Sequence, residues 1–126
     1  MKKIILIAAL AVSIVSGSEC ENPKNNFDSI YCLNKVYIQT DKNLNESYSA
    51  LRKHLYGQER YALLKSQREW IEVRNDECSL SKNGMFYVNL RCTTDVTRKR
   101  TEFLNNRLTE CKSGAGCMKS KLIEIY

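Results

Sequence analysis

Apolar residues recur at helical spacing along two long segments on either side of Gly57. In the first segment, over 32–56, they follow one another at steps of three and four residues, which places them on one helix face. These positions, with Thr40 among them, are Leu33, Val36, Tyr37, Leu44, Tyr48, Leu51 and Leu55. The second segment starts just after Gly57 and keeps the same spacing as far as Cys78. Because so short a connection makes neighbouring helices fold back, we predict an antiparallel helical hairpin with Gly57 ending its first helix.

The remaining segments predict one further helix and three shorter regions. Helical spacing returns over 92–111, and the inward positions there are Val96, Phe103, Leu104 and Leu108. Residues 79–91 break the spacing with a Lys-Asn-Gly turn signal, so we predict a loop, within which "MFYVNL" could form a short extended stretch. We expect the polar segment 19–31 to be irregular and the tail 117–126 to add a short packed segment. The predicted fold class is all-α, an antiparallel helical hairpin plus a third helix.

Polar side chains lie on the stripes by which the two expected helices face each other. The first helix contributes Asp41, Asn45 and Tyr48, and the second contributes Gln67, Trp70 and Arg74. In an antiparallel pair Asp41 lies level with Arg74, since the first is 16 residues before Gly57 and the second is 17 residues after it. A buried guanidinium is tolerated when it is paired and hydrogen-bonded. The favoured interpretation is a structural polar network, and the alternative is a groove that touches a ligand or partner.

The first 18 residues have the pattern of a secretory signal peptide. Lys2 and Lys3 form a charged start, Ile4–Val15 form an apolar run, and small residues follow. We therefore expect a signal peptide over 1–18 and one domain over 19–126. No second apolar run follows, so we expect no membrane insertion after cleavage.

All six cysteines lie after this leader, and an even number in a small exported chain is typical of disulfides. The favoured pairs are Cys20–Cys32, Cys78–Cys92 and Cys111–Cys117, each of which closes a short loop. A Cys32–Cys78 bond is the alternative, because it would staple the open end of the helical hairpin. The spacings are not those of a zinc site, and we expect neither a metal nor a cofactor.

Charge and motif content narrow the classes of function. Without Lys2 and Lys3, the 20 basic residues fall to 18 against 14 acidic ones, a formal charge of +4. This weakly favours acidic partners, while the lack of a basic run with interleaved aromatics argues against nucleic acid. His54 is the only histidine, and neither a phosphate loop nor a metal-binding motif is present. We therefore do not expect an enzyme.

Three sequence elements resemble a known family. They are Asp41-x-x-Leu44-Asn45-x-x-Tyr48, Leu64-x-x-Gln67-Arg68-x-Trp70-x-x-x-Arg74-x-x-x-Cys78 and Cys92-x-x-x-x-Thr97-x-x-Arg100-x-x-x-Leu104. Together, over roughly 20–108, they resemble the LprI-type lysozyme-inhibitor domain of bacterial envelope proteins. The resemblance implies an all-helical, disulfide-bonded periplasmic or surface protein, and for its founding members inhibition of lysozyme by direct binding. By the family pattern, Arg100 turns inward to join the polar network.

The hypothesis for function is a secreted or periplasmic binding protein, monomeric and without enzymatic activity. It would block lysozyme or another cell-wall lytic enzyme by occluding the enzyme's cleft with the segment 79–91. Met85, Phe86 and Tyr87 are the expected anchors, although they could instead plug the open end of the helical hairpin. The alternative function is an envelope interaction or immunity-type module with a partner other than lysozyme.

Overall fold

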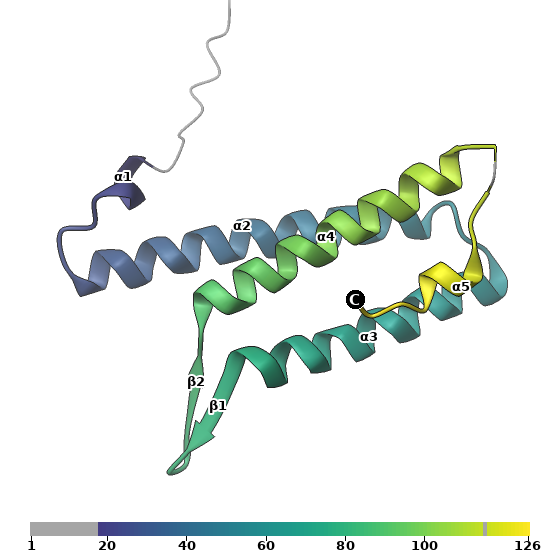
Figure 1. Cartoon of the computed structure of the whole chain (residues 1–126). Helices are drawn as coiled ribbons and strands as arrows, with labels where there is room; N and C mark the ends of the chain where they lie inside the picture. Colours follow the sequence, from purple (N-terminus) through teal and green to yellow (C-terminus); the bar gives the residue numbers. More distant parts are fainter. Residues whose placement is uncertain (1–17, 115) are drawn as a thin grey trace, which may run out of the picture.

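Three long helices form the body of the protein in the computed structural model, which describes residues 18–114 and 116–126 (Figure 1). They are α2 (Asn26–Arg52), α3 (Gly57–Cys78) and α4 (Leu90–Lys112), and two short helices, α1 (Ser18–Glu21) and α5 (Lys119–Leu122), lie near the ends of the chain. This confirms the predicted all-α class. Of the predicted signal peptide, residues 1–17 lie outside the described part of the chain.

The helix α2 begins six residues before the predicted start, because the sequence supplies a cap there. The side chain of Asn25 accepts a hydrogen bond from the backbone N–H of Asp28 at 2.8 Å. The carboxylate of Asp28 in turn accepts from the backbone N–H of Lys24 at 3.3 Å, and its charge favours a helix N-terminus. The prediction that 19–31 is irregular is therefore wrong, since helix α1 and the first turns of α2 occupy much of it.

The connection between α2 and α3 also differs from the prediction. Helix α2 ends at Arg52, and four residues intervene before α3, of which Leu55 is fully buried. Gly57 has a φ of +54°, which glycine adopts without strain, and it starts α3 rather than ending α2. The buried side chain of Leu55 therefore fixes the turn. The first helix does not continue to residue 56 as predicted.

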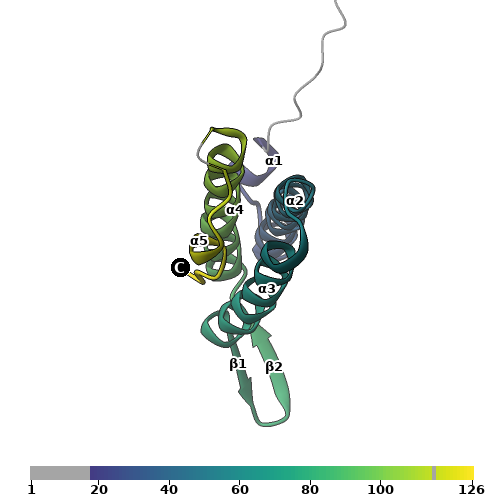
Figure 2. The same ribbon diagram turned by 90° about the vertical axis from the view of Figure 1, so that its right-hand side faces the viewer.

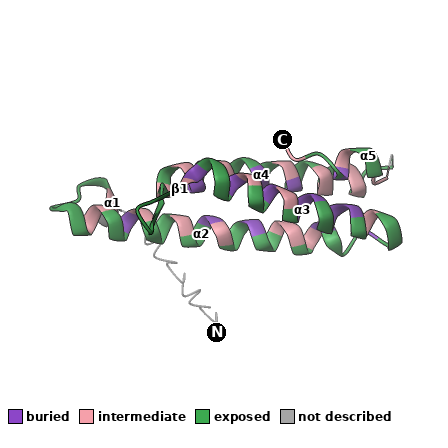
Figure 3. Cartoon of the chain, turned by 90° about the horizontal axis from the view of Figure 1, so that it is seen from below, coloured by how far each residue is buried: buried purple, intermediate pink, exposed green. Residues whose placement is uncertain are grey.

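The three long helices are not packed equally against one another. Helices α2 and α4 run side by side in the same direction, and α3 runs the opposite way (Figures 1 and 2). Helix α3 packs chiefly against α4 and α5. The shared core consists of Leu44, Leu51, Leu55, Ala62, Leu63, Trp70, Leu104 and Leu122. Figure 3 shows this core as a buried stripe on the inward sides of the helices. By these contacts α4, rather than α3, is the main packing partner of α2.

Residues 79–88 form a β-hairpin where a loop was predicted, although the extended stretch considered within 85–90 is present as its second strand. Strand β1 (Ser79–Lys82) pairs with strand β2 (Met85–Val88), and the pair projects away from the helices (Figures 1 and 2). The two turn residues, Asn83 and Gly84, have φ angles of 52° and 73°. Two positive φ angles define the turn that best matches strand twist, and Asn-Gly is its preferred sequence.

Three disulfides join Cys20 to Cys32, Cys78 to Cys92 and Cys111 to Cys117. These are the favoured pairs, and the alternative Cys32–Cys78 bond is not formed. The third bond ties the end of α4 to the C-terminal segment, where Leu122 is buried in the core. The tail therefore packs on the helices, as predicted.

Candidate functional site

Two guanidinium groups approach the ring of Trp70 in the interior of the molecule. Trp70 is 2% exposed, and the Cζ atoms of Arg74 and Arg100 lie 5.1 and 5.8 Å from its ring centroid. The Cζ atom of Arg100 lies 4.3 Å from the ring centroid of Phe103 as well. Such contacts stabilise a cation most where water is excluded. The aromatic side chains therefore offset part of the unfavourable burial of charge.

Arg74 is held at the edge of this interior by three polar neighbours. Its Nη1 atom lies 3.6 Å from Oδ1 of Asp41 and 3.4 Å from Oγ1 of Thr97. Its Nε and Nη2 atoms each donate to Oδ1 of Asn75 at 3.2 Å. The side chain of Asp41 is 40% exposed, whereas that of Arg74 is 10% exposed. The structure thus brings Asp41 and Arg74 together, with the carboxylate partly in water.

Arg100 is buried more deeply and has neutral partners. Its Nε atom donates to Oε1 of Gln67 at 2.9 Å, and its Nη1 atom donates to the backbone carbonyl of Glu124 at 2.8 Å. Weaker bonds reach the carbonyl of Ile125 and the hydroxyl of Ser66. No carboxylate in 18–114 or 116–126 forms an ion pair with Arg100. Burial lowers the pKa of Arg100 to about 10, so the group remains charged at neutral pH.

Asn45 and Tyr48 lie outside this interior network. Together with Asp41 and Gln67 they line an open groove of about 440 Å³ between α2 and α3. Asn45 is exposed and Tyr48 is half-buried. Among the described residues, neither side chain takes part in a hydrogen bond or ion pair. The predicted set of polar residues is therefore divided between the interior and the groove.

The β-hairpin contains the predicted partner contacts Met85, Phe86 and Tyr87 and exposes them to solvent. Leu80, Met85, Phe86, Tyr87 and Val88 are all exposed, and Phe86 reaches 69%. The strand register places three of them on one face and the other two on the opposite face. The alternative role, in which this segment plugs the open end of the helical hairpin, is wrong because these side chains lie in solvent.

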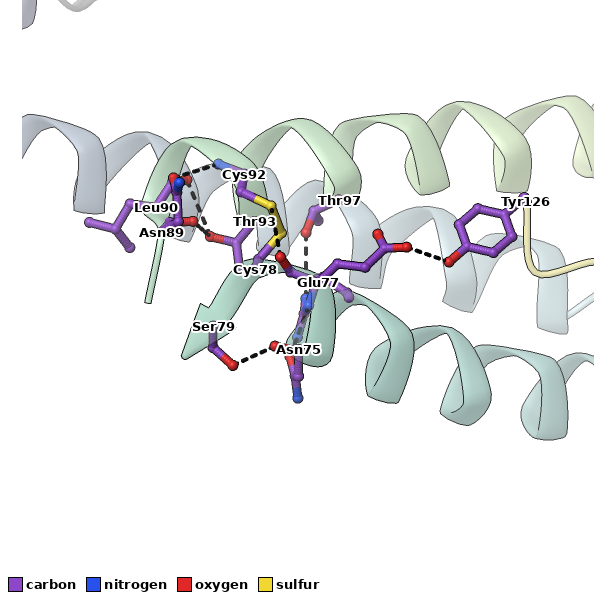
Figure 4. The surroundings of a disulfide bond; sticks show 11 residues. Asn75, Glu77, Cys78, Ser79, Asn89, Leu90, Cys92, Thr93, Thr97 and Tyr126 are labelled. Atoms are coloured by element: carbon purple, nitrogen blue, oxygen red, sulfur yellow. Dashed lines mark hydrogen bonds between the residues drawn. A yellow bond between two sulfur atoms is a disulfide. The ribbon is translucent and has the colours of Figure 1, made fainter. Parts of the chain in front are cut away.

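The base of the β-hairpin is fixed to the helices at several points. The Cys78–Cys92 disulfide joins the end of α3 to the start of α4, and the N–H of Asn89 donates to the carbonyl of Cys78 at 2.8 Å (Figure 4). Oδ1 of Asn89 caps α4 by accepting from the N–H of Cys92 at 3.0 Å. The hydroxyl of Ser79 donates to the carbonyl of Asn75. A hairpin held in this way loses little further freedom when it binds a partner.

The C-terminal tail lies against the same end of α3. The hydroxyl of Tyr126 donates to Oε1 of Glu77 at 2.8 Å (Figure 4), and this bond raises the pKa of Tyr126 above its usual 10.0. The tail bounds a small cavity of about 250 Å³, with Trp70 and Phe103 among its lining residues. The sequence predicted a packed tail but not these contacts, because no residue pattern indicates that Tyr126 lies beside Glu77.

Metal-binding clusters and membrane-spanning helices are absent from residues 18–114 and 116–126. No cluster of three or more His, Cys, Asp or Glu side chains there is arranged to hold a metal ion. None of the described helices has both the length and the apolar character needed to cross a bilayer. The described chain offers a polar groove and an apolar hairpin as its candidate sites.

These features define a small disulfide-stapled helical protein that presents a fixed β-hairpin to solvent. The chain belongs to the family described as lysozyme inhibitor LprI, whose model matches residues 20–104. This confirms the resemblance seen in the sequence, and the family is one of inhibitors rather than enzymes. No curated protein and no solved structure matches the chain. The family and the three disulfides together indicate an extracytoplasmic protein.

Proposed function

We propose that this protein binds and blocks a cell-wall lytic enzyme, with lysozyme as the first candidate, by inserting the β-hairpin 79–88 into the enzyme's cleft. The observation that carries the proposal is the exposure of five apolar side chains on a hairpin whose base is closed by the Cys78–Cys92 disulfide. Contiguous exposed apolar surface is typical of a protein-binding site, and aromatic side chains often provide most of the binding energy there.

The charge of the hairpin supports a cleft of this kind. Lys82 is the only charged residue in 79–88, and its position opposite Met85 places it beside the turn. Glycoside hydrolases use a pair of carboxyl groups in their clefts. Lys82 shares its face of the hairpin with Tyr87, and a cationic group beside an exposed aromatic side chain is complementary to such a site. At physiological salt, charges more than about 8 Å apart are screened. The attraction between Lys82 and carboxyl groups in a cleft therefore outweighs the long-range effect of the chain's net positive charge.

In this proposal the protein acts as a secreted or periplasmic monomer. It forms no covalent bond with its target and needs no cofactor, because occlusion of the cleft is sufficient. A second candidate partner is an acidic envelope protein or wall polymer, which the formal charge of +4 that remains without Lys2 and Lys3 favours. That partner would bind through charge over a wide surface rather than through the apolar hairpin.

The test is an assay of cell-wall lysis by lysozyme in the presence of increasing amounts of the purified protein. We expect inhibition, and we expect Phe86→Ala to weaken it about tenfold or more, since a central aromatic anchor contributes at least that much. Phe27→Ala is the matched control, because Phe27 is 75% exposed, against 69% for Phe86, and lies on α2. Circular dichroism would verify that both variants fold.

Two outcomes would count against this function. Unchanged lysis at a large excess of protein would exclude lysozyme as the target. Equal loss of inhibition in Phe86→Ala and Phe27→Ala would exclude the hairpin as the inhibitory element. Inhibition that disappears at moderate salt in both variants would favour the second, charge-driven partner.

A further inference from the structure

The groove between α2 and α3 places polar side chains without partners beside polar side chains that the fold uses. Its lining includes Asp41, Asn45 and Tyr48 from α2, and Gln67, Arg68 and Arg74 from α3. Its volume of about 440 Å³ lies within the range of roughly 300–1,000 Å³ that small-ligand sites occupy. These residues belong to two of the three sequence elements by which the chain resembles its family. The binding role proposed for the β-hairpin gives them no function.

Hydrogen-bonding capacity remains free in this groove. In the described part of the chain, the side chains of Asn45, Tyr48 and Arg68 form neither hydrogen bonds nor ion pairs. Asp41 has one ionic partner, Arg74 at 3.6 Å, and its carboxylate is 40% exposed. In a purely structural network these side chains would form hydrogen bonds with other residues of the protein, as Arg100 does. Here several donors and acceptors converge on one open space instead.

The fold also orients these groups. Asp41, Asn45 and Tyr48 are spaced at i, i+4 and i+7, which places them in a row along one face of α2. Arg74, held by Asn75 and Thr97, fixes the carboxylate of Asp41 from the opposite helix. Because α2 packs mainly on α4, the row on α2 and the residues of α3 stay apart and the groove stays open.

The chemistry of the groove selects a neutral polar ligand. One carboxylate lies beside two guanidinium groups, so neither a strongly anionic nor a cationic ligand is matched. Leu64 and Ile71 are exposed on only one wall, which is too little apolar surface for an amphipathic helix. Sugar hydroxyl groups both donate and accept, and the apolar face of a sugar ring suits a tyrosine ring. The exposed amide of Asn45 matches the amide of an N-acetyl group.

We propose that the α2–α3 groove binds a short segment of an N-acetylated glycan. Asp41, Asn45 and Arg68 hydrogen-bond its hydroxyl and acetamido groups, and Tyr48 packs against a sugar ring. The glycan site shares no residue with the β-hairpin and does not depend on the proposed inhibition. Binding here holds the protein on a polysaccharide while the hairpin remains free for an enzyme.

The experiment is a titration of the full mature chain with tri-N-acetylchitotriose, followed by calorimetry and by amide chemical shifts. We expect saturable binding with shifts centred on α2 and α3 around Asn45 and Gln67. The variant Asn45→Ala should weaken binding about fivefold, the effect expected from losing a hydrogen bond to the ligand. Asn34→Ala is the matched control, since Asn34 is exposed on the same helix and lies outside the groove.

Four results would overturn the proposal. They are no binding of the probe at millimolar concentration, equal weakening by Asn34→Ala, shifts confined to the hairpin, and equal binding of maltotriose, which lacks acetamido groups. Circular dichroism of Asn45→Ala tests whether the variant is folded. Lysozyme inhibition by Asn45→Ala is expected to stay unchanged, so failure of the glycan site and failure of the inhibitory hairpin are distinguishable.

Discussion

The interior around Trp70 and the β-hairpin distribute polar and apolar groups in opposite ways. The interior buries two guanidinium groups, whereas the hairpin exposes five apolar side chains. Each arrangement is unfavourable when nothing compensates for it. In the interior, ring contacts, the ion pair with Asp41, and hydrogen bonds donated to Gln67 and the tail provide the compensation. At the hairpin no described residue covers the apolar surface, so a partner is the natural source of compensation there.

The largest effect is expected from removing the tail, which supplies acceptors to Arg100. A chain that stops after Met118 keeps the Cys111–Cys117 disulfide but loses the buried Leu122 and both carbonyl partners of Arg100. Arg100 keeps its bond to Gln67, so loss of the two carbonyl partners costs about 1–3 kcal/mol, and loss of a buried leucine adds roughly 2 kcal/mol more. Urea denaturation of the full and shortened chains measures this difference in the free energy of unfolding.

The control for this truncation is the same deletion in the background Arg100→Met. Methionine fills similar space without a charge, so the deletion should be less destabilising there by at least about 1 kcal/mol. Equal losses in the two backgrounds would mean that Arg100 is not coupled to the tail. The interior would then depend on Leu122 alone.

This dependence on the tail shows where sequence reasoning reached its limit. Helical spacing was sufficient to predict three long helices, because their buried faces repeat regularly. Counting from Gly57 also placed Asp41 level with Arg74. The carbonyls that bind Arg100 belong to residues 124 and 125, beyond the family match, and any residue type could supply them. Backbone acceptors of this kind become visible only when the path of the chain is known.

The β-hairpin and the helix start at Asn26 were missed for a different reason, since their signals were present. Asn83-Gly84 is the preferred turn of a two-residue hairpin, and Asn25 with Asp28 forms a helix cap. The strand "MFYV" lacks the alternation of a half-buried strand, because both of its faces lie in solvent. The sequence left open whether the polar stripe is buried or opens onto a groove, because this depends on how α4 packs along α2.

A medium effect is expected from Arg74→Ala at the edge of the interior. Asp41 is partly exposed and can regain water, so the main losses are the contact with Trp70, the bond to Thr97 and the space left empty. We expect a decrease of about 2–3 kcal/mol in the free energy of unfolding. Asp41→Asn should cost less than about 1 kcal/mol, because the ion pair is partly in solvent. Similar losses from both variants would show that the ion pair, rather than packing, stabilises this region.

The smallest effect on global stability is expected from Gly84→Ala in the hairpin turn. This variant tests the β-hairpin, the second of the two regions compared. Gly84 has a φ of +73°, and a side chain there strains the turn by about 1–2 kcal/mol, although no atom lies within 4 Å of the added Cβ. The strain should disorder the hairpin without lowering the melting temperature of the helices, because the hairpin buries little. Gly114→Ala, at a glycine without positive φ, is the control.

Amide exchange and lysozyme inhibition would be measured together on these two glycine variants. Fast exchange confined to 79–88, with reduced inhibition and an unchanged melting temperature, is the expected result for Gly84→Ala. It would mean that the hairpin is separable from the helical body and that its order serves binding. A melting temperature that falls as far as in Arg74→Ala would instead make the hairpin part of the folding unit. Its exposed side chains would then contribute to the stability of the helices.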